Sequence, residues 1–194
     1  MFRHPNLPGT GLALLLVAVS AVACGSANLL PPANVAVADD TVTLWAVTGT
    51  AIALPSAYDI ILATPARTDR TSSFDFVFDF LADSLTGDTV PALEPRGAVG
   101  LSADGGLIKV ASTFGAITSA PGSGYNSTSP VYVDTTTVVA VRSRTETCNF
   151  GITSGVFAKL QPLVIDRVAR KIVLHLVVDP NCGYRSLQPG IPGS

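Results

Sequence analysis

The 194-residue chain has few of the groups on which most catalytic and nucleic-acid-binding sites depend. Only 13% of its residues are charged, with 12 Lys and Arg against 14 Asp and Glu, so there is no basic stripe for nucleic acid. A transition-metal site needs several nitrogen or sulfur ligands around one ion; loss of the N-terminal leader would leave only His175 among the histidines, and a Cys148–Cys182 disulfide would occupy those two sulfurs. There is no Gly-rich phosphate loop and no alternation of strand and helix patterns. We therefore expect no metal, no cofactor, no nucleotide and no nucleic-acid partner.

The apolar run near the N-terminus is too short for a membrane span. It follows Arg3 and His4, covers residues 12–22 with only Ser20 interrupting it, and ends in small residues. A positive start, a short apolar stretch and small residues are typical of a secretory signal peptide. A helix over such a run is about 16 Å long, whereas a hydrocarbon core is about 30 Å thick. We predict a signal peptide over residues 1–23.

The residues at the end of this leader are Ala21-Val22-Ala23-Cys24-Gly25. They resemble the lipobox of bacterial lipoprotein precursors, with Ala21 where that family most often has Leu. The resemblance implies that Cys24 is acylated and anchors the chain in a membrane. It further implies, through Gly25, transfer to the outer membrane of the cell envelope. The alternative is ordinary secretion, in which cleavage after Ala23 leaves Cys24 free or paired.

The odd number of cysteines favours the lipid. The chain has only Cys24, Cys148 and Cys182, and an exported protein with an odd count leaves one cysteine to be explained. An acylated Cys24 frees the other two to pair in an oxidising compartment. A bond closing a loop of about 35 residues stabilises the fold by about 3 to 4 kcal/mol. We predict a Cys148–Cys182 disulfide; two buried unpaired thiols are the alternative.

Composition divides the remainder into three parts. Residues 24–41 contain Pro31-Pro32 among small residues and predict a lipid anchor followed by a flexible tether. Residues 42–185 predict the folded domain, and the Pro- and Gly-rich residues 186–194 predict a disordered tail. Cleavage after Ala23 removes one charged residue, Arg3, leaving 11 Lys and Arg against 14 Asp and Glu. This length is enough for one domain with a real core.

The folded part has the pattern of an all-β protein. In "SSFDFVFDFLAD", Phe74, Phe76, Phe78 and Phe80 share one face of an extended chain, since side chains alternate along a strand. Asp104-Gly105 predicts a hairpin within "GLSADGGLIKV". Further strands are expected over residues 42–47, 50–54, 57–63 and 89–93, and "PSAYDIILAT" is alternatively one short helix.

The last third predicts three consecutive strands, in "VYVDTTTVVAVRSRT", "GVFAKLQPLVID" and "RKIVLHLVVD". In an antiparallel meander, the first and third strands end at the same rim, where Cys148 and Cys182 would follow them. Two strand spacings, about 9 to 10 Å, must still close before the sulfurs meet. The whole pattern predicts an antiparallel β-sandwich of about seven to nine strands, immunoglobulin-like in general architecture.

The candidate binding residues are few. Tyr125 and Asn126 lie in the polar loop "TSAPGSGYNSTSP", whose length suggests a contact with a partner. The sequon at Asn126-Ser127-Thr128 is read as a polar turn, because a lipobox implies a bacterial host. A carbohydrate-binding module would instead gather exposed aromatic side chains, for which the candidates are Trp45, Tyr125, Tyr132 and Tyr184.

Catalytic patterns are weak. A serine hydrolase would need His175 between a serine and an acid, and there is no G-x-S-x-G elbow. Asp75 and Asp79 are about 13 Å apart on a strand, too far for a glycosidase pair. Asp83 and Asp88 flank a turn that either binds calcium or is solvated. We expect an exported, lipid-anchored, non-enzymatic module of the cell envelope with a protein or glycan partner. Carbohydrate binding and serine hydrolysis remain alternatives.

Overall fold

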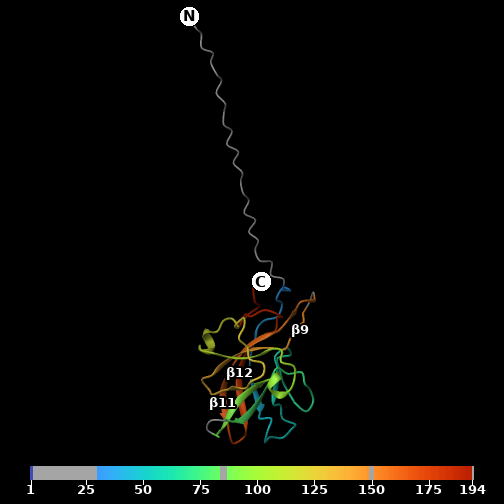
Figure 1. Ribbon diagram of the computed structural model, residues 1–194, viewed down its shortest axis with the longest axis vertical. Helices are drawn as coiled ribbons and strands as arrows, with labels where there is room; N and C mark the ends of the chain where they lie inside the picture. The colour runs from blue at the N-terminus through green and yellow to red at the C-terminus, as the bar shows by residue number, and fades with distance from the viewer. Residues whose placement is uncertain (2–29, 84–86, 149–150, 194) are drawn as a thin grey trace.

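The computed structural model describes residue 1 and residues 30–83, 87–148 and 151–193. Two five-stranded antiparallel sheets pack face to face (Figure 1), so the predicted all-β sandwich is confirmed. The leader, Cys24 and the first residues after it lie outside the described residues.

The strand order follows the chain only in part. Sheet 1 has the order β1 (Ala38–Trp45), β12 (Lys171–Asp179), β11 (Phe157–Asp166), β8 (Val138–Arg142), β6 (Gly106–Val110). Sheet 2 has the order β3 (Thr64–Ala66), β2 (Ala57–Asp59), β4 (Phe76–Ala82), β5 (Thr89–Pro95), β7 (Val131–Tyr132). A small ribbon pairs β9 (Glu146–Thr147) with β10 (Thr153–Ser154), and two 3₁₀ turns are η1 (Arg96–Val99) and η2 (Phe114–Ala116).

The described residues contain more strands than expected, because several are very short. Five of the twelve, namely β2, β3, β7, β9 and β10, have only two or three residues. Strands of this length leave no alternating pattern to detect. The run "VYVDTTTVVAVRSRT" is also divided: β7 joins sheet 2, residues 134–137 form a turn, and β8 joins sheet 1.

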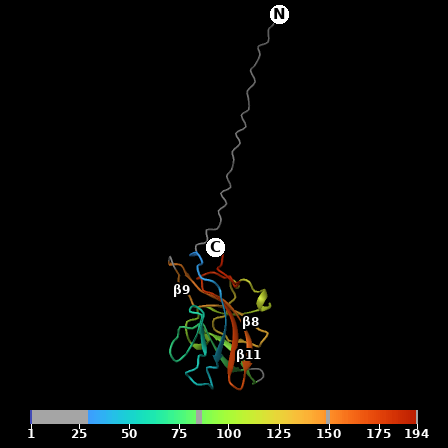
Figure 2. The same cartoon turned by 180° about the vertical axis from the view of Figure 1, so that it is seen from behind.

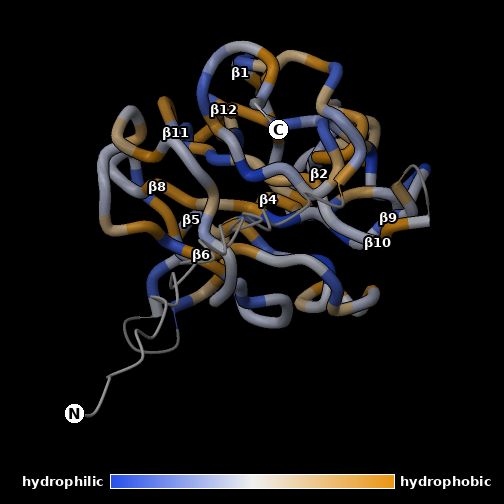
Figure 3. Tube along the Cα trace, turned by 90° about the horizontal axis from the view of Figure 1, so that it is seen from above, coloured by the Kyte–Doolittle hydropathy of each residue, from blue (hydrophilic) through white to orange (hydrophobic). Residues whose placement is uncertain are grey.

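The core lies between the sheets, where apolar side chains from both inner faces meet. Ile172, Leu174, Leu176 and Val178 of β12 all belong to it, as their shared face predicts. Orange stretches follow the strands in Figure 3, including parts of β4, β8 and β12. Each fully buried side chain of this size stabilises the fold by about 1.5–3 kcal/mol in transfer terms.

The phenylalanine pattern is right for three residues and wrong for the fourth. Phe76, Phe78 and Phe80 lie in the main core, whereas Phe74 belongs to a separate cluster with Ala57, Ala66 and Val77. The reason is that β4 begins only at Phe76 and residue 75 is a bend. Alternation along a strand does not extend through a bend, so Phe74 packs on the other face of sheet 2.

Two local predictions are wrong. Residues 100–103, the expected arm before Asp104-Gly105, follow the 3₁₀ turn η1 and form no strand, so they do not pair with β6 in a hairpin. Gly105 has φ +82°, and a Cβ there would lie 2.5 Å from the Ser143 carbonyl oxygen. The glycine thus allows close backbone approach to the chain after β8. The strand expected over residues 50–54 is a turn, and "PSAYDIILAT" contains the short strand β2 rather than a helix.

The segment that starts at residue 30 (blue) and the C-terminal segment (red) lie at the same end of the sandwich (Figures 1 and 2). We call this the anchor end, defined by residues 30–37, the Cys148–Cys182 bond and residues 181–193. The opposite, distal end carries the β11–β12 turn at residues 166–171 and the turn between β4 and β5.

The expected tether and tail are both ordered where they are described. Val37 donates its N–H to the Gly190 carbonyl (2.9 Å), and Leu187, which is buried, donates to Thr118 (2.9 Å). The strand β1 already begins at Ala38. Contacts with distant parts of the chain thus hold these described residues in place, although the composition of their own segments has no period.

Candidate functional site

The predicted binding loop places its tyrosine against the protein. The Tyr125 ring is half-buried and lies 6.2 Å from the Phe157 ring, while its hydroxyl donates to the Pro121 carbonyl (2.9 Å). The Arg142 guanidinium lies 5.5 Å from the ring centroid. Burial raises the pKa of Tyr125 to about 12. This ring therefore packs on sheet 1 and fixes the loop there, and whether the loop contacts a partner stays a prediction.

Asn126 is exposed, and its side chain forms hydrogen bonds within its own loop. Its Oδ1 accepts hydrogen bonds from the N–H groups of Thr128 (3.0 Å) and Ser129 (2.9 Å). Its backbone pairs in both directions with Leu107 of β6. Asn126 thus shapes a turn and closes part of the β6 edge, as a side chain that mimics a backbone turn commonly does.

The four aromatic candidates for a sugar site are not brought together. Trp45 lies on β1 of sheet 1 and Tyr132 on β7 of sheet 2, while Tyr184 is buried and Tyr125 half-buried. A flat platform of several exposed rings is therefore not formed by these residues. Tyr132 is the most open of them, with 40% of its surface exposed.

Tyr132 lines a groove of about 480 Å³ beside the edges of the two sheets. Lys109 of β6 and Arg167 of the β11–β12 turn contribute cations, and Asp134 contributes an anion. Hydrogen bonds from the hydroxyls of Thr136 (2.7 Å) and Thr137 (2.8 Å) lower the pKa of Asp134 to about 2. Asp134 is therefore ionised at neutral pH, and the groove combines one exposed ring with fixed charges of both signs.

His175 has an acidic partner but contacts no serine in the described part of the chain. Its Nε2 lies 2.7 Å from Asp39 Oδ1, and its ring lies 4.3 Å from the Phe114 ring. The side chain is partly exposed on the outer face of sheet 1, as the sequence predicts. A hydrolase would need a nucleophile on the other ring nitrogen, and these contacts do not supply it.

Lys159 is a buried cation that the alternating pattern of β11 does not reveal. Its Nζ donates to the carbonyls of Ile117 (2.7 Å) and Phe114 (3.0 Å) and lies 4.6 Å from the centre of the Phe114 ring. Burial lowers the pKa of Lys159. The lysine fastens η2 to sheet 1, beside a mostly apolar cavity of about 270 Å³.

A buried ion cluster joins the two sheets. Arg144, in the segment after β8, donates to Asp59 Oδ2 (3.0 Å) and Asp75 Oδ2 (3.1 Å), and its backbone N–H donates to Asp75 Oδ1 (2.7 Å). Ile60 N–H donates to Asp75 Oδ2 (2.8 Å). Burial raises the pKa of the Asp75 carboxyl, and the hydrogen bond and charge of Arg144 oppose this.

Asp79 has a separate set of partners at the distal end. Its Oδ1 accepts from Thr48 Oγ1 (2.8 Å) and lies 3.4 Å from the Arg170 guanidinium. Asp75 and Asp79, which the sequence predicts are too far apart for a catalytic pair, thus each bind a different arginine. The signal that could have revealed both pairs is an aspartate within an otherwise apolar strand, since buried carboxylates need a cation.

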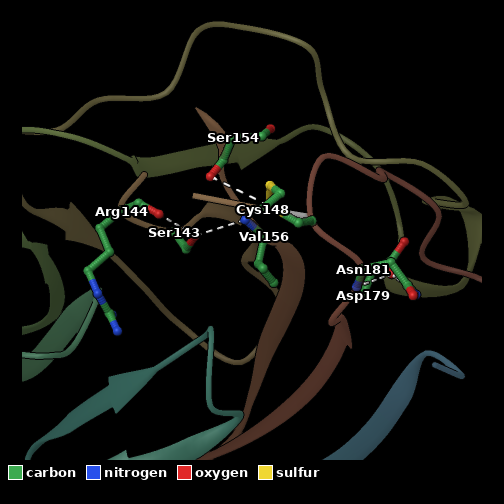
Figure 4. Close-up of a disulfide and its surroundings, with 8 residues drawn as sticks. Ser143, Arg144, Cys148, Ser154, Val156, Asp179 and Asn181 are labelled. Carbon is green, nitrogen blue, oxygen red and sulfur yellow. Dashed lines mark hydrogen bonds between the residues drawn. A yellow bond between two sulfur atoms is a disulfide. The ribbon is translucent and has the colours of Figure 1, made fainter. Parts of the chain in front are cut away.

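The Cys148–Cys182 disulfide is present, with the two Cα atoms 5.9 Å apart (Figure 4). Cys148 directly follows β9, the first strand of the small ribbon, and Cys182 follows β12 after a short turn. The ribbon carries Cys148 across the rim, which closes the gap that two strand spacings would leave. Cys24, the predicted acylation site, lies outside the described residues.

Asn181, next to the disulfide, holds the start of the described chain. Its Oδ1 accepts from the N–H groups of Asn34 (3.0 Å) and Val35 (3.1 Å), and its Nδ2 donates to the Val35 carbonyl (2.7 Å). Nδ2 also donates to Asp179 Oδ1 (2.7 Å), a bond drawn in Figure 4. Burial raises the pKa of Asp179, opposed by its hydrogen bonds with Asn181.

The acidic turn is closed by its own backbone: Asp83 N–H donates to the Asp88 carbonyl (2.7 Å) and Gly87 N–H to the Asp83 carbonyl (2.8 Å). Over the described ranges, no three His, Cys, Asp or Glu side chains are grouped to hold a metal ion. Nor is any helix in these ranges long and apolar enough to cross a bilayer.

The chain matches no protein-family model, and none of the curated proteins matches it.

Proposed function

We propose that this protein is an exported, lipid-anchored, non-enzymatic β-sandwich of the bacterial cell envelope. Cys24 carries the lipid, the outer membrane receives it, and the domain faces the periplasm or the cell surface. The domain acts as a binding or structural module for a protein or glycan of the envelope.

The observation that carries the proposal is the use of the three cysteines. Cys148 and Cys182 are bonded to each other, which accounts for two of the three cysteines of the chain and leaves Cys24 as the third. It stands directly after a leader and within a lipobox-like sequence.

The buried charged groups support a non-enzymatic role. Arg144 donates hydrogen bonds to carboxylates that connect the two sheets, and Lys159 donates to backbone carbonyls that hold η2 on sheet 1. The one exposed histidine pair, His175 with Asp39, has no nucleophile among its described contacts. These groups stabilise the fold rather than leaving reactive atoms free.

Intact mass spectrometry of the native protein, extracted from membranes, tests the anchor. We expect a chain beginning at Cys24, heavier by an acylated glycerol and lighter by the two hydrogens lost at the disulfide. Cys24→Ser is the control and should give a soluble, unacylated chain with the same fold. A native product that retains residues 1–23, or that has an unmodified Cys24, contradicts the proposal.

A glycan ligand in the Tyr132 groove is a second candidate function. The exposed ring beside Asp134, Lys109 and Arg167 supports it, because sugars bind by stacking on an aromatic face with hydrogen bonds around it. Insoluble peptidoglycan is the probe: Tyr132→Ala should lower the bound fraction at least fivefold. Trp45→Phe, on the other sheet, is the matched control. Equal binding by all three proteins, or no binding by any, excludes the groove as the site.

A further inference from the structure

The anchor end is fastened directly to the chain that leads to Cys24. The backbone of residues 34 and 35 is hydrogen-bonded to the Asn181 side chain, and the Val37 N–H donates to the Gly190 carbonyl. These residues therefore cannot act as a free linker. The chain from Cys24 therefore joins the domain at the rim beside the disulfide. The hydrogen bonds fix both the position and the direction in which it enters.

The reach from Cys24 to this rim is short. Six peptide steps separate Cys24 from Leu30, the first residue of the described domain. Fully extended, they span at most about 20 Å, and a flexible chain of that length averages about 13 Å. With Cys24 acylated, which is the proposed function on which this inference rests, the anchor end stays within that distance of the lipid.

The surface of the anchor end is suited to a bilayer. Val35 and Ile191 are 48% and 59% exposed, on two segments joined by the hydrogen bond from Val37 to Gly190. Residues 30–36 and 183–193 contain one charged side chain, the exposed Arg185, and no carboxylate. The acids beside these segments are already engaged or partly covered. Asp179 is buried and accepts hydrogen bonds from Asn181, Asp39 lies 2.7 Å from His175, and Glu146 of β9 is half-buried in a hollow with Pro31.

The distal end has the opposite character. Its turn at residues 166–171 carries Asp166, Arg167, Arg170 and Lys171, and the turn between β4 and β5 carries Asp83 and Asp88. Val168 is 97% exposed, but it stands alone among these charges. The molecule is therefore polarised along its strands, with few charged side chains at the anchor end and many at the distal end.

We infer that the anchor end docks on the lipid surface, with Val35 and Ile191 entering the interface and Arg185 meeting anionic headgroups. Exposed apolar side chains with a nearby cation favour binding to the headgroup region of an anionic membrane. The lipid then fixes the orientation of the domain as well as its location. The strands stand away from the bilayer, and the Tyr132 groove and the β11–β12 turn face outward.

The test uses tryptophan as a reporter in the acylated, full-length mature protein. Trp45, the only tryptophan, is first removed by the substitution Trp45→Phe. A single reporter tryptophan is then introduced into this variant by Val35→Trp, Ile191→Trp or Val168→Trp. Each protein is reconstituted in phosphatidylethanolamine–phosphatidylglycerol vesicles with and without brominated acyl chains. We expect at least a twofold loss of fluorescence on bromination at positions 35 and 191, and no change at position 168.

The outcomes separate this inference from the proposed function. Proteins that float with the vesicles but show no quenching at positions 35 and 191, or equal quenching at all three positions, overturn the docking and leave the anchor intact. A native chain that is unacylated and does not float with the vesicles overturns both the docking and the proposed lipid anchor. Arg185→Gln provides a second measurement: quenching at position 35 should become independent of the phosphatidylglycerol content. Unchanged dependence contradicts the role of Arg185.

Discussion

At the residue scale, Arg144 is the side chain on which two buried carboxylates depend. Asp59 lies in sheet 2 and Asp75 in the segment leading into β4, whereas Arg144 lies in the segment that follows β8 of sheet 1. Buried ion pairs add little over an apolar core, but removing one partner leaves a buried charge uncompensated. The cluster therefore specifies how the sheets meet at this point.

Arg144→Gln should lower the free energy of unfolding by about 3–5 kcal/mol at pH 7, because two carboxylates lose their cation. Urea denaturation measures it. Arg70→Gln is the matched control: Arg70 is an exposed arginine 3.7 Å from Asp69, and its loss should change stability by no more than about 0.5 kcal/mol. The deficit at Arg144 should shrink as pH falls and Asp75 is protonated. Equal effects of the two variants would contradict this account.

Two aspartates should make opposite contributions to the pH dependence of stability. Burial raises the pKa of Asp179, so the folded state binds its proton more readily than the unfolded state does, and stability falls as pH rises from about 4 through the folded pKa. The pKa of Asp134 is lowered to about 2, so its contribution is present above about pH 4 and is lost as pH falls toward 2.

Replacing each aspartate by asparagine should remove its contribution to the slope of unfolding free energy against pH. Relative to wild type, Asp179→Asn should become more stable as pH rises from 4 to 7. Asp134→Asn should lose its disadvantage as pH falls from 4 to 2. Denaturation midpoints measured over pH 2–7 provide the comparison, and slopes of the same sign for both variants would contradict it.

At the element scale, the β9–β10 ribbon and the turn after β12 owe their position to one covalent bond. The Cys148–Cys182 bond closes a loop of 34 residues that contains β10, β11 and β12. The same turn presents Asn181 to the start of the described chain. The disulfide thus orders the anchor end from outside the main core.

The double variant Cys148→Ser/Cys182→Ser should lose about 3–4 kcal/mol of unfolding free energy, as expected for a loop of this length. Cys24→Ser is the matched control and should leave the stability of the domain unchanged. Reduction of the wild-type protein should reproduce the loss. A double variant as stable as wild type would show that the anchor end holds together without the bond.

Elements with a clear period could be predicted from the sequence, and elements ordered by distant contacts could not. The alternation of β12 places Ile172, Leu174, Leu176 and Val178 correctly in the core, and the meander brings the two cysteines to one rim. The order of residues 34–37 depends on Asn181, about 146 positions away. No local pattern carries that information.

The same distinction applies to the candidate sites. The short strand β7 gives no signal, so the sequence does not show that Tyr132 lies on the edge of a sheet, beside a groove. The burial of Lys159 depends on η2 folding over β11. Tyr125 was predicted as a contact residue because its loop is long and polar, but Phe157 and Pro121 draw it inward.

At the scale of the whole molecule, one core serves both sheets. The main cluster includes Leu44, Leu160 and Leu174 of sheet 1 and Phe76 and Phe78 of sheet 2. Neither sheet can expose its inner face without exposing that of the other. The domain should therefore unfold as a single unit.

Phe78→Ala should lower the unfolding free energy by about 3–5 kcal/mol, since the ring is fully buried and its removal leaves a cavity. Fluorescence of Trp45, on sheet 1, and far-ultraviolet circular dichroism should give coincident transitions in both proteins. Val168→Ala, at an exposed turn, should change stability by less than about 0.5 kcal/mol. Separate transitions for the two signals would show that the sheets unfold independently.

The pairing of β1 with β12 also determines how the domain bears force. The two strands pair antiparallel along their length, from Ala38 with Val178 to Trp45 with Lys171, and their hydrogen bonds lie perpendicular to the strands. Tension between the anchor end and something held at the β11–β12 turn runs parallel to both strands. It loads all of these bonds together in shear instead of peeling them apart one at a time, which is the arrangement best able to resist a mechanical pull.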